Sequence, residues 1–312
     1  FSRVLKSLNR RGYCIVHPWD TSEASLTQIR QKFGCAQQHV RANDIGIVAV
    51  CSKASPWKRQ LDTSKYLGLQ TSEHFPHTDG AYLNGFVQKT NKIACINPPA
   101  YDLLQCVRSS SVGGASIVID GQAILEDLLR KKPHIARALY EQGCVSFCRD
   151  DQSAFWVAIY EKLSVGRYRL RFRYDKTVYP SSKHVRKALR HLYDHYLTNA
   201  RYRTTFRLEP GQVLIVDNLR MLHGRTSFKS NSEHERFLRR TWVADETLHE
   251  APTSLLGDVD SSCRVFERLK NYACMEQAGQ GLKPPLTPGI YLPGNLEAVL
   301  HRQDIDELPD AC

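Results

Sequence analysis

Residues 73–85 read EHFPHTDGAYLNG, and in this segment His77 and Asp79 stand two positions apart. Side chains at positions i and i+2 of an extended strand point to the same face, so we expect the imidazole and the carboxylate to project into one space. Together they could bind one ion. A His-x-Asp pair is a weak motif in a chain with twelve histidines, and the alternative is an exposed polar turn.

A second segment, residues 211–228, reads GQVLIVDNLRMLHGRTSF. Its apolar strand, residues 213–216, runs into a polar Asp-Asn corner, and the chain then delivers His223. Two histidines and one carboxylate are the ligand set of non-haem Fe(II) oxygenases, because this set leaves coordination positions open. We interpret His77, Asp79 and His223 as such a set. Other histidines are compatible with ordinary surface or core positions: His74, His191, His195, His234 and His249.

Two arginines follow in the segment RFLRRTWV. Arg236 and Arg240 share strand parity, so on a strand they would face the same way. Burying two guanidinium groups is costly unless an anion neutralises them, and the guanidinium fork matches a carboxylate. We therefore expect an anion site. The alternative is that one arginine is exposed at the strand end and pairs with Glu233 or Glu235.

The composition is ordinary for a soluble globular protein: 312 residues, 42% apolar and 24% charged. No apolar run approaches the roughly 18 residues of a membrane span, and the basic N-terminal segment lacks the apolar stretch of a secretory signal. The ten cysteines contain no Cys-x-x-Cys pair, which disfavours a zinc site or a disulfide framework. We expect reduced thiols, a cytoplasmic location and no membrane association.

A formal net charge of +11 is compatible with nucleic-acid binding. However, the basic residues are spread along the chain, and there is neither a concentrated basic tract nor a nucleic-acid-binding motif. We expect no nucleic-acid partner and favour a small, anionic molecule. An oxygenase directed at RNA or DNA is the alternative.

Helical periodicity and strand-like runs alternate irregularly along the chain. Helices are predicted at residues 4–12, 22–33, 122–142 and 185–198. Strands are predicted at residues 12–18, 45–52, 92–99, 102–110, 115–121, 168–175, 204–218 and 237–245. The turn SVGG, residues 111–114, is of hairpin type and predicts that the strands on either side of it pair.

Many short strands interrupted by a few helices predict a mainly β fold with helical insertions, of the double-stranded β-helix (jelly-roll) type. A doubly wound parallel sheet is disfavoured because strands and helices do not alternate regularly. We expect one domain over residues 1–250, with a helical insertion around residues 122–200. Residues 251–312, rich in Pro and Gly, would form a C-terminal extension that packs on the surface or builds an oligomer contact.

Four segments in this order, FPHTDG, GGAS, DNLRMLHGR and RFLRR, resemble the taurine dioxygenase/2,4-D dioxygenase superfamily of Fe(II)/2-oxoglutarate-dependent oxygenases. The DNxRxLHGR corner is especially similar to γ-butyrobetaine and trimethyllysine hydroxylases, and the paired arginines to clavaminate synthase-type amino-acid hydroxylases. The resemblance spans residues 12–245. It implies a jelly-roll enzyme that uses Fe(II), the cosubstrate 2-oxoglutarate and O₂ to oxidise a substrate C–H bond, with release of succinate and CO₂.

Carried over by position, the resemblance implies three iron ligands that are also the catalytic residues: His77, Asp79 and His223. Arg236 would hold the distal carboxylate of 2-oxoglutarate, assisted by the hydroxyl of Ser116. Arg240 would contact the substrate or the other end of the cosubstrate.

The resemblance also implies substrate contacts just after the first iron-binding strand and in the segment RFRYD, namely Tyr82, Asn84 and Asp175. The alternatives are that Tyr82 is a core aromatic and Asp175 a turn residue. We expect hydroxylation of a small amino-acid-like or carboxylate-bearing metabolite. Desaturation, cyclisation or epoxidation would use the same ligands, and a jelly-roll ligand-binding protein without turnover is the non-enzymatic alternative. A homo-oligomer is left open.

Overall fold

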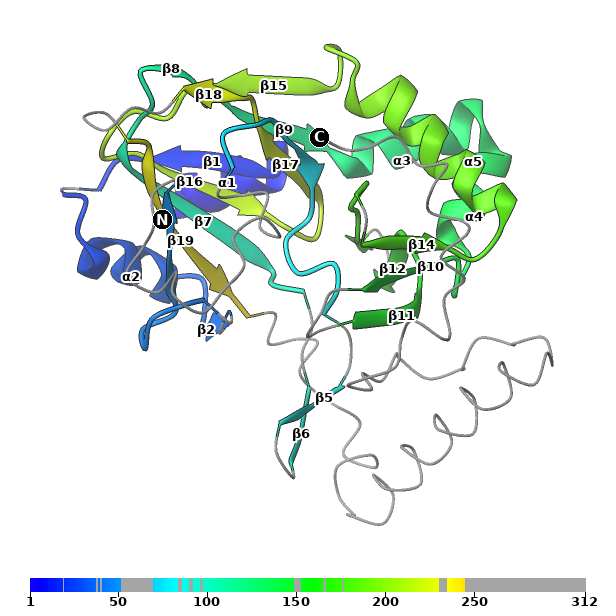
Figure 1. The fold of residues 1–312 in the computed structure, drawn as a ribbon, viewed down its shortest axis with the longest axis horizontal. Coiled ribbons are helices and arrows are strands. Elements are labelled where there is room, and N and C mark those ends of the chain that lie inside the picture. The colour runs from blue at the N-terminus through cyan, green and yellow to red at the C-terminus, as the bar shows by residue number, and fades with distance from the viewer. Residues whose placement is uncertain are drawn as a thin grey trace.

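The computed structural model covers the chain, and its described part contains two large antiparallel sheets with flanking helices (Figure 1). The structure describes residues 1–18, 20–37, 39, 41–51, 70–83, 86–89, 92–95, 98–148, 153–164, 167–175, 177–229 and 235–244. The predicted extension over residues 251–312 lies outside this part. Searched over the described residues, no helix combines the length and the apolar character needed to cross a membrane.

The larger sheet has six strands. Its order is β1 (Tyr13–Val16), β16 (Val213–Asp217), β7 (Tyr101–Arg108), β19 (Phe237–Val243) and β2 (Ala36–Gln37), and β3 (Ile47–Cys51) also pairs with β19. The second sheet has four strands in the order β15 (Arg203–Phe206), β9 (Ser116–Asp120), β17 (Met221–Arg225) and β4 (His74–His77). Segments far apart in the sequence therefore lie side by side, above all β17 and β4.

Shorter strand pairs and helices complete the described fold. The pairs are β5 (Phe86–Lys89) with β6 (Lys92–Cys95), β8 (Val112–Gly113) with β18 (Phe228–Lys229), β12 (Tyr160–Ser164) with β13 (Arg167–Leu170), and β10 (Val145–Cys148) with both β11 (Ser153–Val157) and β14 (Val178–Pro180). The helices are α1 (Ser2–Arg11), α2 (Glu23–Gln31), α3 (Gly121–Lys131), α4 (Pro133–Tyr140), α5 (Lys183–Leu192) and the π-helix η4 (Tyr193–Leu197). The expected helical insertion thus also contains strands.

Local sequence signals account for the helix ends. Helix α1 ends at Gly12, which adopts a left-handed conformation with φ 74° and donates its N–H to the Leu8 carbonyl. Helix α2 begins after Ser22, whose hydroxyl accepts a backbone N–H of the first turn. The single helix predicted over residues 122–142 is wrong, because Pro133 starts a second helix and the residue before a proline is disfavoured in the α conformation.

One apolar layer lies between the two large sheets. On β16, Leu214 and Val216 face the four-stranded sheet, whereas Val213 and Ile215 face the opposite way, toward α1 and α2. The inner cluster draws on both sheets, which shows that they face one another: Cys106, Val118, Leu208, Leu214, Val216, Met221 and Leu238. The strand alternation therefore gives the six-stranded sheet two buried faces.

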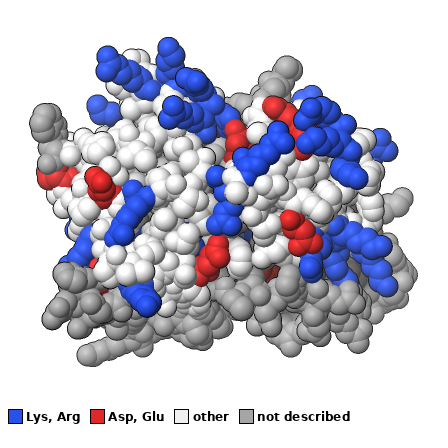
Figure 2. Space-filling view, turned by 90° about the horizontal axis from the view of Figure 1, so that it is seen from above, with Lys and Arg blue, Asp and Glu red and all other residues white. Residues whose placement is uncertain are grey.

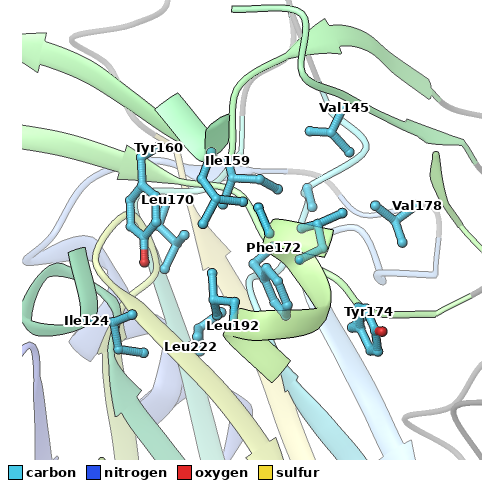
Figure 3. Close-up of a cluster of buried hydrophobic side chains, with 14 of the residues drawn as sticks. Ile124, Val145, Ile159, Tyr160, Leu170, Phe172, Tyr174, Val178, Leu192 and Leu222 are labelled. Carbon is cyan, nitrogen blue, oxygen red and sulfur yellow. The ribbon is translucent and has the colours of Figure 1, made fainter. Parts of the chain in front are cut away.

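The outer face of the four-stranded sheet packs against the helices of the middle segment. Figure 3 shows Leu222 of β17 among Ile124 of α3, Leu192 of α5 and Phe172. Each of these apolar side chains is almost fully buried, and such burial stabilises a fold by roughly 1.5–3 kcal/mol per side chain. Helices α3 to α5 thus support the sheet that carries β17 and β4.

The turn at residues 111–114 does not make a hairpin, so this prediction is wrong. Strand β7 belongs to the six-stranded sheet and β9 to the four-stranded sheet. Both Gly113 and Gly114 have φ 71°, and the backbone of Gly113 lies so close to Ser227 that a side chain would not fit. The two glycines therefore lead the chain from one sheet to the other, while β8 pairs with β18.

Charged side chains are distributed over the surface in separate groups. Figure 2 shows several groups of Lys and Arg on one face, with Asp and Glu between them. The net charge of +11 is therefore not gathered into one continuous stripe on that face.

Gly224 allows β17 and β4 to approach. A Cβ there would lie 2.6 Å from the His74 carbonyl oxygen and 2.9 Å from the Pro76 nitrogen, both backbone atoms. We expect Gly224→Ala to lower the free energy of unfolding by about 1–3 kcal/mol, the usual effect of overpacking. Urea denaturation measures this change.

The comparison variant is Gly211→Ala. Gly211 has φ 89°, but a Cβ there would meet no atom within 4 Å. This substitution should cost only left-handed strain of about 1 kcal/mol. Equal losses in the two variants would contradict a steric role for Gly224.

Candidate metal centre

Strand pairing brings the candidate ligands together. In the register of β17 with β4, His223 lies opposite His77, and the two ring centroids are 4.6 Å apart. Asp79 Oδ1 lies 3.4 Å from His77 Nε2 and 4.0 Å from His223 Nε2. All three residues are buried, and one ligand atom from each lies within 4.8 Å of the others, a cluster that could hold a metal ion.

Asp79 reaches this cluster from a turn and not from a strand. Strand β4 ends at His77, so the predicted strand parity does not apply to Asp79. The turn is held by Asn218, whose Oδ1 accepts the Asp79 N–H at 2.8 Å and whose Nδ2 donates to the Asp79 and Pro99 carbonyl oxygens. Asn218 is the second residue of the Asp-Asn corner. This corner therefore positions Asp79, although a long stretch of chain separates the two.

The protonation states suit metal binding. Burial and the neighbouring His77 lower the pKa of His223 to about 3, so its imidazole is neutral at neutral pH. Burial raises the pKa of Asp79, but Arg240 and His77 outweigh that effect and hold the pKa well below its usual value. His77 Nδ1 lies 2.8 Å from the Phe75 carbonyl oxygen, which fixes the proton there and leaves Nε2 free as a ligand. Two imidazoles and one carboxylate fit ferrous iron.

Two further residues contact the Asp79 carboxylate. Arg240 Nη1 donates to Asp79 Oδ2 at 2.8 Å, and Trp242 Nε1 donates to the same oxygen at 2.7 Å. The predicted role of Arg240 in binding a cosubstrate or substrate stays a prediction, since the structure pairs this arginine with Asp79. Sequence reasoning missed Trp242, although it stands two positions after Arg240 and so shares its strand face.

A second buried carboxyl group lies beside the cluster. Asp102 on β7 is fully buried, and its Oδ2 lies 3.5 Å from His223 Nε2. Burial and the nearby Asp79 raise the pKa of Asp102 well above its usual value. Sequence reasoning missed it, and the available signal was an aspartate directly before two leucines of a strand.

Arg236 lies buried next to a second arginine. Its guanidinium carbon is 5.5 Å from the centre of the Phe228 ring, and the Arg225 guanidinium carbon is 4.5 Å from the same centre. Burial and the charge of Arg225 lower the pKa of Arg236 to about 9, a penalty that a bound anion would offset. Ser116 is buried as well and lies opposite Arg225 in the register of β9 and β17.

The predicted substrate residues fall in different surroundings. Tyr82 is 3% exposed and belongs to the core cluster that packs on helices α3 to α5. Asp175 accepts hydrogen bonds from Arg173 at 2.6 and 2.8 Å and from the Thr177 N–H at 2.9 Å. Asn84 lies outside the described residues.

The architecture and the cluster define a mainly β protein with a buried His-Asp-His group able to hold a divalent metal. The chain belongs to the taurine catabolism dioxygenase TauD, TfdA family, whose model matches residues 1–242.

Among curated relatives, the human gamma-butyrobetaine dioxygenase is 24% identical over 222 residues, which are 64% of this chain and 57% of that protein. The Pongo abelii gamma-butyrobetaine dioxygenase matches to the same extent. The chain therefore spans less than two thirds of the length of these relatives.

Two solved structures share the fold. One is asparagine oxygenase in complex with Fe(II), 2S,3S-3-hydroxyasparagine and succinate, with a TM-score of 0.58, 18% identity and 78% of each chain covered. The other is the non-haem iron oxygenase OrfP with Fe, succinate and (3S)-hydroxy-L-Arg, with a TM-score of 0.57, 14% identity and 79% of this chain and 80% of that chain covered.

We expect His223→Ala to weaken metal binding by more than the roughly 10–100-fold that outer partners of a metal site contribute. The imidazole is neutral before the metal binds, so its removal should leave the fold in place. Calorimetric titration with Fe(II) under anaerobic conditions, together with circular dichroism, measures both effects. His191→Ala on α5 is the control, because this histidine lies outside the cluster. Wild-type affinity in His223→Ala would remove His223 from the ligand set.

Proposed function

We propose that the chain is an Fe(II)- and 2-oxoglutarate-dependent dioxygenase that hydroxylates a C–H bond of a small amino-acid-like or carboxylate-bearing metabolite. The observation that carries this proposal is the buried cluster of His77, Asp79 and His223 within 4.8 Å. Membership of the TauD, TfdA family supports the same activity. The proposal includes release of succinate and CO₂.

We also infer that the six-stranded and four-stranded sheets form a double-stranded β-helix. Two features support this inference: the apolar layer that both sheets share, and the cross-sheet connection through Gly113 and Gly114. The TM-scores of 0.58 and 0.57 to iron oxygenases agree with it.

The chain's own residues would bind the iron and orient the reactants. His77, Asp79 and His223 would hold iron on one face and leave its other positions for the cosubstrate and O₂. When bound, the iron and the cosubstrate would supply the oxidising chemistry that breaks the substrate C–H bond. The protein would orient the reactants and exclude water from the buried cluster.

The arginine pair supports a dicarboxylate cosubstrate. Arg236 and Arg225 are both buried and share the Phe228 ring, so their charges reinforce one another. A carboxylate would neutralise this charge and could accept two parallel N–H bonds from the Arg236 fork. Ser116 stands close by in the sheet register and would add a hydroxyl donor.

The substrate class draws support from the similar structures. Their printed complexes contain hydroxylated asparagine and hydroxylated arginine, and the human relative is named for gamma-butyrobetaine. These ligands share an amino-acid-like or carboxylate-bearing character. Tyr82, Asn84 and Asp175 stay our proposed substrate contacts. We also propose that the enzyme is cytoplasmic, acts on a small molecule, and binds neither membrane nor nucleic acid.

An anaerobic spectrum tests the proposal directly. Adding Fe(II) and 2-oxoglutarate to the protein should give a weak visible charge-transfer band, because chelation of the keto acid to iron creates it. Absence of the band would favour a ligand-binding protein without turnover. Succinate release stimulated by polynucleotides, with affinity that falls steeply with salt, would favour a nucleic-acid-directed oxygenase instead.

We expect Arg236→Ala to raise the KM for 2-oxoglutarate by about 10- to 100-fold. The variant loses charge-assisted hydrogen bonds worth roughly 1.5–3 kcal/mol, and each 1.4 kcal/mol corresponds to a factor of about ten. Succinate formation at varied 2-oxoglutarate measures the change. Arg239→Ala is the matched control, because Arg239 lies on the other side of β19 and donates to the Thr21 carbonyl oxygen. An unchanged KM in Arg236→Ala would move this role to Arg240.

The substrate can be found by its mass. A metabolite library incubated with the enzyme, Fe(II) and 2-oxoglutarate should contain amino-acid-like compounds that gain one oxygen atom, with an equal amount of succinate formed. Mass spectrometry measures the gain. A product that instead loses two hydrogens would favour desaturation or cyclisation, and this result would correct the proposed reaction type.

A further inference from the structure

We infer that Trp242 is a positioning residue for the metal-binding carboxylate: with Arg240 it occupies Asp79 Oδ2 and leaves Oδ1 as the one oxygen that Asp79 offers to a metal. The inference rests on the proposed metal centre but not on the substrate or on turnover.

The two oxygens of Asp79 have different partners. Oδ2 accepts the indole N–H of Trp242 at 2.7 Å and a guanidinium N–H of Arg240 at 2.8 Å. Oδ1 is the oxygen that faces the histidines, at 3.4 Å from His77 Nε2 and 4.0 Å from His223 Nε2. The carboxylate is therefore divided into one oxygen bound by protein donors and one oxygen directed at the metal ligands.

Strand β19 fixes both donors. Arg240 and Trp242 are two positions apart on this strand and so share the face that looks toward Asp79. The Arg240 guanidinium carbon lies 5.0 Å from the centre of the Trp242 ring, and the His39 ring meets that ring edge-on at 4.7 Å. Trp242 is only 3% exposed, so packing holds the indole N–H in one direction.

The division of the carboxylate has a chemical consequence. A carboxylate that binds a metal through both oxygens occupies one coordination position more than a carboxylate that binds through one. The proposed reaction needs two positions for 2-oxoglutarate and one for O₂ beside the three protein ligands. Hydrogen bonds to Oδ2 keep Asp79 in the one-oxygen mode and orient it before the metal arrives.

A purely structural role for Trp242 is the competing explanation, because the indole also belongs to the large apolar core. That role predicts a loss of stability with unchanged metal affinity. Trp242→Phe keeps an aromatic ring but removes the N–H. Replacing Trp242 with 3-benzothienylalanine, which has sulfur in place of the indole N–H, keeps the shape almost unchanged and covers the case in which Trp242→Phe folds poorly.

The test titrates Co(II) into the wild-type protein and these variants and records affinity together with the visible d–d spectrum. We expect both Trp242 variants to bind Co(II) roughly 10- to 100-fold more weakly, the range for an outer partner of a ligand. Their spectrum should change as well, because Oδ2 then keeps only the Arg240 donor and Asp79 is held less firmly in the one-oxygen mode. Arg239→Gln is the control on the same strand, since Arg239 contacts Thr21 and Glu23 on the other side.

The possible outcomes separate this inference from the proposed function. Wild-type Co(II) affinity and spectrum in the benzothienyl variant would overturn the inference, even if the enzyme turns over 2-oxoglutarate. Weaker binding and a changed spectrum in the variants would support it, even if the wild-type protein shows no turnover. A wild-type protein that binds no Co(II) would overturn both the inference and the metal centre.

Discussion

The pairing of β17 with β4 is the constraint on which the site depends. It sets His223 opposite His77, although long stretches of chain separate the two strands. The approach is close because Gly224 has no side chain to meet the backbone of residues 74–76. Pro76 is tolerated in β4 because, among the described strands, β4 lies at the edge of its sheet, and its pairing with β17 is irregular between His77 and His74. Asn218 then ties the Asp79 turn to the end of β16.

Burial and neighbouring charges set the protonation states of the buried metal centre. Asp79 stays ionised because Arg240 compensates its burial, while His223 stays neutral because burial disfavours its charged form. Arg236, directly before β19, and Arg225 at the end of β17 bring two positive charges around the Phe228 ring. Arg240 contacts Asp79 whereas Arg236 lies over the Phe228 ring, so the two arginines serve different parts of the site. One part suits a metal ion and the other suits an anion.

Sequence patterns predicted much of the architecture through local physics. The apolar run of β16 is visible in the sequence, as are the glycine that ends α1 and the serine before α2. The prediction of a single helix over residues 122–142 is wrong because Pro133 starts a second helix. The hairpin at residues 111–114 was predicted wrongly because two consecutive glycines permit several chain directions. The direction in which the chain leaves residues 111–114 is set by strands elsewhere in the sequence, with which β7 and β9 pair in different sheets.

The sequence by itself determined which groups are available: two histidines, a carboxylate, and the arginines Arg236 and Arg240, in an order typical of one enzyme family. It also determined which side chains of β19 share a face, because that parity is a local property. Only the tertiary structure decided that Asp79 arrives from a turn, that Asp102 lies beside His223, and that Trp242 and Arg240 bind the same carboxylate oxygen. These contacts join segments from distant parts of the chain. Sheet register and burial set the contacts, and neither register nor burial can be derived from a single segment.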